Sequence, residues 1–140
     1  AVRPLIEVET IERVISRVRS DAALAGAICA TRAVDTLKRV EGSTIVNTPD
    51  RSFLWAAQTP QVFRKSILVE AHERALQERI AATDDSSLVE HLGGVVEVVE
   101  SSNDNIKVTY PSDLTICEAL LGKHLMDGAD SCIPFDGGEA

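Results

Sequence analysis

Polar side chains that could bind a phosphorylated ligand occur at predicted loops and strand ends along the whole chain. They are Arg3, Asp35, Thr36, Lys38, Asp50, Arg51, Thr59, Thr83, Asp84, Asp85 and Lys107. Ligands of open α/β sheets bind beyond the carboxyl ends of the strands. Residues in strand-to-helix loops are therefore better candidates than charges on helix faces. The residue types favour a small phosphorylated ligand held by a few local cations.

Two of these cations each allow two interpretations. Lys107 lies in a β-branched stretch just before a predicted helix, so it could point at an anion or simply face solvent from a strand. Arg51 follows Asp50 in the segment 48–52. It could be a turn residue paired with that carboxylate, or it could bind a phosphate with two of its N–H groups. The sequence alone leaves both alternatives open.

The segment 83–85, Thr-Asp-Asp, is typical of a helix N-cap. A helix N-terminus also binds phosphate or a substrate hydroxyl, so the two roles are compatible. Trp55 is the only Trp in the chain. Packing in the core or at an interface is its expected role, and stacking on a ligand is the alternative.

Several common catalytic and metal-binding patterns are missing from the sequence. It has neither the GxGxxG nor the GxxxxGK[ST] phosphate loop, and it has no HExxH segment. The three histidines have no partner at ligand spacing, and we expect them on helix faces: His72, His91 and His124. The three cysteines have no CxxC spacing, which argues against a disulfide framework and a metal site: Cys29, Cys117 and Cys132.

Composition restricts the class of protein further. The 140 residues include 14 Lys and Arg against 22 Asp and Glu, a net charge of −8. This acidic balance argues against nucleic acid as the main partner, because phosphate backbones need a basic surface. With 44% hydrophobic and 26% charged residues, the chain is expected to fold as one domain. No apolar run approaches the ~18 residues of a membrane span.

The spacing of apolar residues predicts helices and strands in alternation. We expect helices over 8–20, 65–80, from Thr83 or Asp84 to the Gly93-Gly94 pair, and from Pro111 onward. Strands are expected at 26–30, 95–99 and 106–109, with a hairpin over 36–48 turning at residues 41–43. This order indicates an α/β layered domain with a mostly parallel sheet. The Gly- and Asp-rich residues 127–140 are predicted to be an acidic flexible tail.

Five segments taken together resemble one family of enzymes. In order, the chain has Ala1-x-Arg3-Pro4, Asp35-Thr36-x-Lys38, Asp50-Arg51-x-x-Leu54-Trp55-x-x-Gln58-Thr59-Pro60-Gln61-x-Phe63, Thr83-Asp84-Asp85 and Asn105-Ile106-Lys107-Val108-Thr109-x-Pro111-x-Asp113-Leu114. This series resembles the 2-C-methyl-D-erythritol 4-phosphate cytidylyltransferases of the non-mevalonate isoprenoid pathway. The ribitol-5-phosphate cytidylyltransferases share much of the pattern and are the main alternative.

The resemblance implies a Rossmann-like α/β nucleotidyltransferase domain of three layers, with a protruding hairpin arm through which the family forms homodimers. Residues 34–51 resemble that arm. Residues 1–126 then correspond to the carboxyl-terminal portion of a single domain that is truncated at its N-terminus. The family's Gly-rich CTP-binding loop and its further Lys precede the segment that matches Ala1. On this reading the 140 residues alone lack turnover.

The family reaction, by resemblance, transfers CMP from CTP to the phosphorylated polyol with Mg²⁺ and releases pyrophosphate. Lys107 would be catalytic and stabilise charge on the α-phosphate. The residues that would hold the acceptor are Arg3, Thr36, Arg51, Thr59 and Thr83. Ala1 would contact the nucleotide, and no residue of the chain is assigned to the metal.

Two further expectations complete this reading. Charge and the short apolar runs argue against a nucleic-acid or membrane partner. The resemblance implies a location in the bacterial cytoplasm or the plastid stroma. A different class of function is a non-catalytic phosphosugar-binding or dimerisation module. Binding of the phosphorylated polyol without turnover of CTP would distinguish that module from the enzyme.

Overall fold

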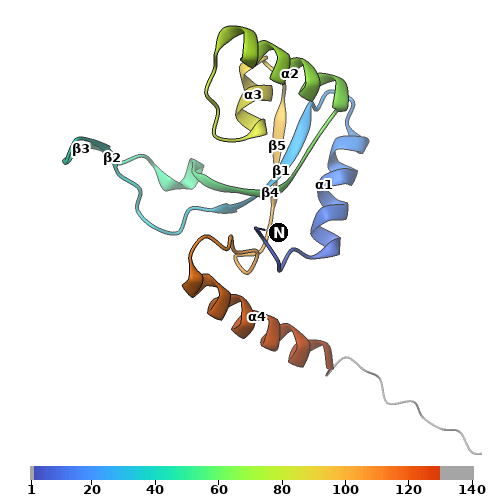
Figure 1. Cartoon of the computed structure of the whole chain (residues 1–140), viewed down its shortest axis with the longest axis vertical. Coiled ribbons are helices and arrows are strands. Elements are labelled where there is room, and N and C mark those ends of the chain that lie inside the picture. Colours follow the sequence, from blue (N-terminus) through green and yellow to red (C-terminus); the bar gives the residue numbers. More distant parts are fainter. Residues whose placement is uncertain (1, 130–140) are drawn as a thin grey trace, which may run out of the picture. The chain divides into compact units, whose positions relative to one another are not determined.

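The helices and strands divide into two units, of which the larger contains the sheet and the arm. The computed structural model describes residues 2–129; one unit comprises residues 6–103, and the other comprises 2–5 with 104–129 (Figure 1). The elements are α1 (Val8–Ser20), β1 (Gly26–Arg32), β2 (Arg39–Glu41), β3 (Thr44–Asn47), a short 3-10 helix (Arg51–Phe53), β4 (Trp55–Phe63), α2 (Lys65–Glu78), α3 (Asp85–His91), β5 (Val96–Glu100) and α4 (Pro111–Ala129).

The predicted boundaries of α1 and of the start of α3 are confirmed. α1 spans the expected residues 8–20 and buries Val14 and Val18 at helical spacing. α3 begins after Asp84, whose side chain accepts a hydrogen bond from the backbone N–H of Ser87 at 3.1 Å. The chain leaves α3 at Gly93, whose φ of 79° suits a residue without Cβ.

The central sheet has the strand order β4-β1-β5. β1 is parallel to β5 and antiparallel to β4, so the sheet among the described residues is mixed. No strand was expected at β4, whose apolar pattern is interrupted by Gln58, Thr59 and Pro60. The structure accommodates them in an irregularity of the β1–β4 register between Ile28 and Ala30, where proline is tolerated within a sheet.

Two apolar clusters cover the opposite faces of this sheet and give the expected three layers. Alternate residues of β1, Ala27 and Cys29, pack with Val14 and Val18 of α1. On the other face, α2 and α3 form a cluster with residues of the sheet: Ala25, Ala71, Ala75, Leu88, Val89 and the partly buried Phe63, Ile67, Leu68, Ile80, Leu92 and Val96. The α/β fold class predicted from the sequence is thus confirmed.

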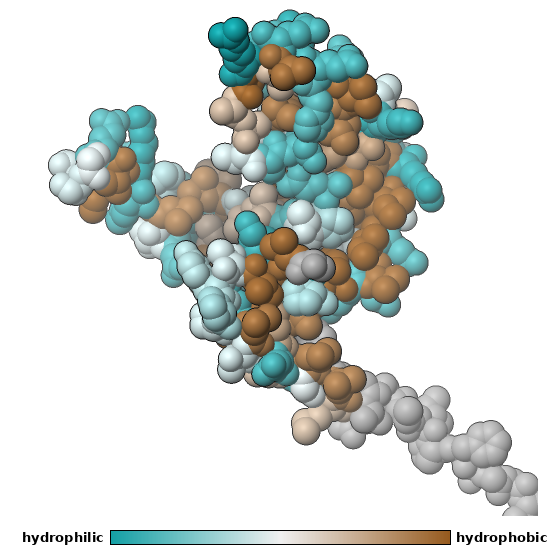
Figure 2. Space-filling model, viewed as in Figure 1, coloured by the Kyte–Doolittle hydropathy of each residue, from teal (hydrophilic) through white to brown (hydrophobic). Residues whose placement is uncertain are grey.

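The predicted hairpin forms the end of an arm that extends away from the sheet (Figure 1). β2 and β3 pair antiparallel, with Val40 opposite Ile45 and Glu41 opposite Thr44. The turn between them uses Gly42 at a φ of 62°, a conformation that glycine adopts without strain. Apolar side chains of this arm lie at the surface (Figure 2).

Two predictions are corrected in the smaller unit: the strand at residues 106–109 and the start of the tail at residue 127. Residues 106–109 form no strand, so the prediction of a strand there is wrong. Their N–H groups bond to Val2 and to the side chain of Asp113 rather than to a neighbouring strand. α4 continues to Ala129, three residues into the predicted tail, and residues 130–140 lie outside the described part. No helix of residues 2–129 has the length and apolarity needed to cross a bilayer.

Candidate active site

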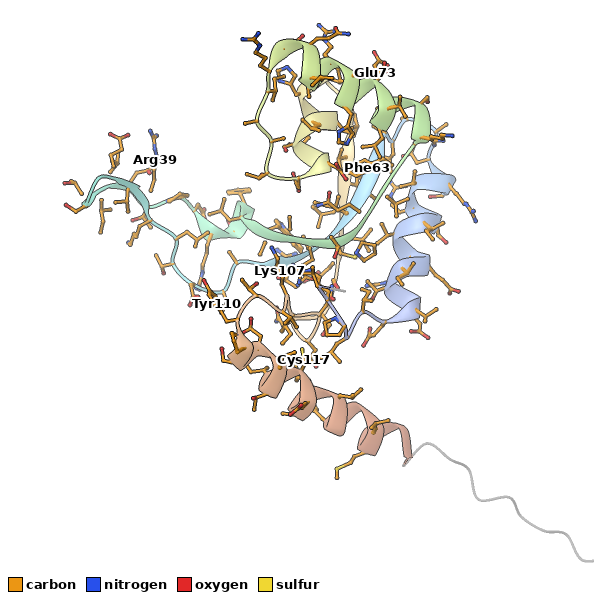
Figure 3. All side chains as sticks on the ribbon, in the orientation of Figure 1. Arg39, Phe63, Glu73, Lys107, Tyr110 and Cys117 are labelled. Carbon is orange, nitrogen blue, oxygen red and sulfur yellow. The ribbon has the colours of Figure 1, made fainter. Side chains whose placement is uncertain are left out.

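Lys107 lies on a segment without regular secondary structure, which backbone hydrogen bonds hold on both sides. The N–H of Ile106 donates to Asp104 at 2.8 Å, and the N–H of Val108 donates to the carbonyl of Val2 at 2.7 Å. The Lys107 side chain is exposed at the surface of this unit (Figure 3). An exposed ammonium on a held backbone is suited to binding an anion as a compact point charge.

Arg3 lies beside the same segment, although about a hundred residues separate the two in the chain. Its guanidinium Nη1 donates to the carbonyl of Asn105, and Val2 bonds to Val108. Residues 2–3 therefore run alongside residues 105–108. Two predicted site cations, Arg3 and Lys107, therefore lie on neighbouring backbone segments. Such a pair can bind a group with more than one negative oxygen, such as a phosphate.

Arg51 stands at the root of the arm in the larger unit. Its Nη1 donates to the carbonyl of Val34 at 2.7 Å, and Asp50 accepts from the N–H of Ser52 at 2.9 Å. The proposed turn pair between Arg51 and Asp50 is therefore replaced by a bond that joins the two sides of the arm. A guanidinium has five N–H donors, so Arg51 keeps donors for a ligand. A hollow of about 380 Å³ opens beside it, lined by Arg32, Ala33, Val34, Asp50, Arg51 and Ser52.

A second hollow of about 320 Å³ adjoins the stretch that leads to Thr36. Its lining comprises Arg32, Ala33, Val34, Asp35, Leu37, Trp55 and Ala56. The guanidinium of Arg32 stacks over the Trp55 ring at 4.5 Å, which is a cation–π contact. Trp55 is thus partly buried against an arginine, and Thr36 is exposed next to the hollow's lining.

Thr59 and Thr83 belong to segments that one side-chain hydrogen bond connects. The amide of Gln61, two residues after Thr59, donates to Asp84 Oδ2 at 2.9 Å. Thr59 lies in the irregular part of β4, where the peptide bond to Pro60 is cis, and both threonines are exposed. The N-cap is Asp84 rather than Thr83, so the Thr83 hydroxyl is not used as the cap.

Asp84 is held in its charged form. Partial burial raises the pKa of this carboxyl, but hydrogen bonds from the Gln61 amide and from Ser87 outweigh that effect and lower the pKa below its usual value. Asp84 therefore accepts hydrogen bonds as a carboxylate at neutral pH. Its oxygens accept hydrogen bonds from the N–H of Ser87 and from the Gln61 amide, which confirms the expected N-cap.

The histidines and acidic residues around α2 and α3 have structural partners. His72 lies 2.9 Å from Asp85, and His91 lies 3.0 Å from Glu78. Both pairs join α2 to α3, which confirms the expected helix-face role of these two histidines. Within residues 2–129, no group of three or more His, Cys, Asp or Glu side chains could hold a metal ion.

The predicted site residues fall into two groups, one in each unit. Arg3 and Lys107 are brought together in the smaller unit. Thr36, Arg51, Thr59 and Thr83 belong to the larger one, and Ala1 lies outside the described residues. Sequence reasoning assigned no bond to Gln61 and no role to Asp113 beyond its place at the start of a helix. Gln61 belongs to the motif over residues 50–63 and Asp113 to the motif over residues 105–114. Membership of these motifs is the sequence signal that could have identified them.

Comparison with known families gives a match over most of the chain. Residues 1–123 match the family described as 2-C-methyl-D-erythritol 4-phosphate cytidylyltransferase. Curated proteins of that name include one from Bacillus licheniformis, 46% identical over 119 residues, covering 85% of this chain and 50% of that protein. One from Synechococcus sp. (strain CC9902) is 48% identical over 120 residues, covering 85% and 52%. The chain spans about half the length of these relatives.

Solved structures agree with this match. The 2-C-methyl-D-erythritol 4-phosphate cytidylyltransferase from Thermus thermophilus superposes with a TM-score of 0.75 at 32% identity, over 86% of this chain and 58% of that one. The 4-diphosphocytidyl-2C-methyl-D-erythritol synthase from Anaerococcus prevotii gives 0.78 at 31% identity, over 86% and 55%. The fold of the described chain is therefore that of these nucleotidyltransferases.

Proposed function

The chain belongs to the 2-C-methyl-D-erythritol 4-phosphate cytidylyltransferase family, and we propose that the whole protein transfers CMP from CTP to 2-C-methyl-D-erythritol 4-phosphate. The products are 4-diphosphocytidyl-2-C-methyl-D-erythritol and pyrophosphate. The observation that carries the proposal is the family match over residues 1–123, within which Arg3 and Lys107 lie on adjacent backbone segments. A location in the bacterial cytoplasm or plastid stroma follows from the resemblance alone.

In the proposed reaction, an oxygen of the acceptor phosphate attacks the α-phosphorus of CTP. A new phosphoanhydride bond forms as the bond to the β-phosphate oxygen breaks, and pyrophosphate leaves with that electron pair. Negative charge increases on the oxygens around the α-phosphorus in the transition state. We assign Lys107 to that charge, because a fixed cation stabilises charge that develops during the reaction more than charge already present.

We assign the remaining predicted residues to binding the acceptor. Arg3 and Arg51 supply guanidinium groups that match the geometry of a phosphate. Thr36, Thr59 and Thr83 supply exposed hydroxyl groups that can bond phosphate oxygens or the polyol. Each of these residues keeps the role that the sequence suggested, and Ala1 keeps its proposed contact with the nucleotide.

We propose that the arm binds the arm of a second copy. Its apolar side chains are 45–70% exposed at Val34, Leu37, Val40, Ile45 and Val46 (Figure 2). Water contact of this kind is unfavourable by roughly 25 cal/mol for each Å² of apolar surface, so a matching apolar partner stabilises the arm. A second copy offers the same surface by symmetry.

The described residues 2–129 contain no cluster of three candidate ligands, so they do not by themselves make a magnesium site. Mg²⁺ is commonly bound through one or two carboxylates together with substrate phosphates. The family resemblance implies the ion, and when bound it would neutralise phosphate charge. The residues of this chain contribute the cations and hydroxyl groups described above.

The experiment that tests the proposal measures pyrophosphate release from CTP by the whole protein with each acceptor in turn. We expect release with methylerythritol phosphate, far slower release with ribitol 5-phosphate, and none without an acceptor. Mass spectrometry identifies the cytidine-linked product. The matched relatives carry the methylerythritol phosphate name, so ribitol phosphate is not favoured. Binding of the polyol phosphate without any turnover of CTP would contradict the proposal and favour a binding module.

A further inference from the structure

Asp113, in the first turn of α4, bonds to the backbone just after Lys107. Its Oδ2 accepts the N–H of Thr109 at 2.8 Å and the N–H of Tyr110 at 2.8 Å. The backbone N–H of Asp113 donates to the carbonyl of Tyr110 at 3.0 Å. Figure 3 shows Lys107 and Tyr110 on the stretch that leads into α4. A single carboxylate oxygen therefore fastens two consecutive residues between Lys107 and the helix.

Asp113 makes one more backbone hydrogen bond than an ordinary helix cap does. A carboxylate at the third helical position commonly bonds to the backbone N–H of the residue that precedes the helix. Asp113 does so with Tyr110, and it also takes the N–H of Thr109, which lies one residue further from the helix. Lys107 lies two residues before Thr109, so the bond to Thr109 restrains the backbone that carries the Lys107 side chain.

The charge of Asp113 suits this role. The N–H of Tyr110, and then that of Thr109, lower the pKa of the Asp113 carboxyl, so it is ionised at neutral pH. The carboxylate also lies in the first turn of α4, where the helix dipole favours negative charge. Hydrogen bonds to a charged acceptor are stronger than those between neutral groups.

Separate backbone bonds hold the residues directly on either side of Lys107. The N–H of Ile106 donates to Asp104 at 2.8 Å, and the N–H of Val108 donates to Val2 at 2.7 Å. The bonds of Asp113 follow that of Val108 and continue the held stretch to the start of α4. Removing the Asp113 bonds therefore frees residues 109 and 110, while Ile106 and Val108 stay attached.

We propose that Asp113 is a positioning residue for Lys107, holding the backbone at Thr109 and Tyr110 so that the ammonium group meets the reacting phosphate. The inference rests on the proposed function, because it assigns Lys107 a phosphate to meet. If Asp113 positions Lys107, then replacing Asp113 lowers the activity even though Asp113 does not touch the substrate. A displacement of about 1 Å at a reacting group can cost on the order of a hundredfold in rate.

A double-mutant cycle in the whole protein tests this inference. We expect Asp113→Ala to lower kcat by at least about tenfold, with small changes in the KM of CTP and of the acceptor. In a Lys107→Ala background, the same change should have almost no further effect on kcat, because the group that Asp113 positions is already gone. An equal loss of kcat in both backgrounds would overturn the inference.

Two control variants keep the test clear of folding defects. Glu118→Ala removes the same charge from an exposed position of α4 and should leave kcat unchanged. Asp113→Asn keeps a side-chain oxygen that can accept both N–H groups, so it should retain most of the activity that Asp113→Ala loses. A loss in Asp113→Asn as large as in Asp113→Ala, with native circular dichroism, would also contradict the inference.

Hydrogen exchange gives a readout that needs no activity. In Asp113→Ala, the amides of Thr109 and Tyr110 should exchange at least about tenfold faster, since each loses its acceptor. Unchanged exchange at both amides overturns the inference even if the protein is an active cytidylyltransferase. Faster exchange in a protein that never turns over CTP with any acceptor would instead show that the proposed function has failed, and the positioning role with it.

Discussion

The segment that carries Lys107 and the arm that carries Thr36 both lie outside the central sheet. Different kinds of hydrogen bond hold the two regions in place. Within its own unit, a bond from Ile106 to Asp104 holds the Lys107 segment before the lysine, and bonds to Val2 and Asp113 hold it after the lysine. The arm bonds mainly to itself, through the ladder of β2 and β3 and a contact of Lys38 Nζ with Thr48 at 2.8 Å. Its apolar side chains remain exposed.

The difference indicates where each region obtains its final geometry. A cation that must meet charge at a reacting phosphorus has to be in place before the substrate arrives, because reorganisation during the reaction reduces catalysis. The bonds around Lys107 provide this within one chain. A two-stranded hairpin is at best marginally stable by itself in water, so exposed apolar side chains on it need a partner to become ordered. The arm is therefore expected to depend on a second copy, and Lys107 is not.

The largest expected effect is on Lys107 itself. Lys107→Ala in the whole protein should lower kcat by about a hundredfold or more, the usual result of removing one transition-state charge contact. The KM values should change little, since the contact is made chiefly in the transition state. Steady-state kinetics with Lys123→Ala, an exposed lysine of α4, as the matched control measures this. An unchanged kcat with a raised KM would make Lys107 a ground-state binding residue.

Next in size is the response of the arm. Val40→Lys places a charge on an apolar side chain that is 48% exposed and faces Ile45 across the hairpin. If copies associate through the arm, the dimer dissociation constant should rise by about thirtyfold or more, as for a central interface residue. Sedimentation equilibrium measures this change. Val69→Lys on α2, where Val69 is 47% exposed, is the control that should leave association intact. Equal behaviour of the two variants would remove the arm from the interface.

A smaller effect is expected at the root of the arm. Arg51→Ala removes a guanidinium that bonds to Val34 and has donors left for a ligand. The KM of the acceptor should rise by about tenfold, equivalent to the loss of one charged hydrogen bond. The KM of CTP should change less. Arg19→Ala, at an exposed position of α1, controls for the lost charge. An unchanged acceptor KM would leave Arg51 with only its structural bond to Val34.

The smallest expected effect concerns stability at Asp84, away from both regions. Because the folded-state pKa of Asp84 is lowered, its contribution to stability is present above the unfolded pKa and is lost as the pH falls through the folded value. Asp84→Ala should therefore lower the free energy of unfolding by about 1 kcal/mol at pH 7, typical of a lost N-cap.

Urea unfolding from pH 7 down to pH 3 measures this difference. The gap between wild type and Asp84→Ala should shrink as the pH falls. Asp35→Ala, which removes an exposed carboxylate, should show no such trend. A gap that stays constant over this range would mean that the bonds from Gln61 and Ser87 do not depend on the charge of Asp84.

Local signals in the sequence were enough to predict much of the fold. The periodicity of α1, the turn at Gly42 and the cap at Asp84 each depend on residues within a few positions of one another. β4 was missed because its middle contains a proline, which a sheet tolerates only at an edge or an irregularity. The irregular pairing with β1 cannot be read from the β4 sequence itself.

The candidate site shows the same limit. Lys107 could be named from its place before a predicted helix, but residues 106–109 around it were wrongly predicted as a strand. Their partners are Val2, about a hundred positions away, and the side chain of Asp113. A β-branched run indicates extended backbone without saying what it bonds to. The proximity of Arg3 to this segment likewise depends on a long-range contact that no local pattern encodes.

Hydrogen exchange of the whole protein at several concentrations tests the contrast between the two regions most directly. We predict that the amides of Val108, Thr109 and Tyr110 are protected to the same degree at every concentration, because their acceptors lie in the same chain. Protection of the β2–β3 amides should instead increase with concentration as copies associate. Rapid exchange at residues 108–110 together with an arm protected equally at all concentrations would contradict the account.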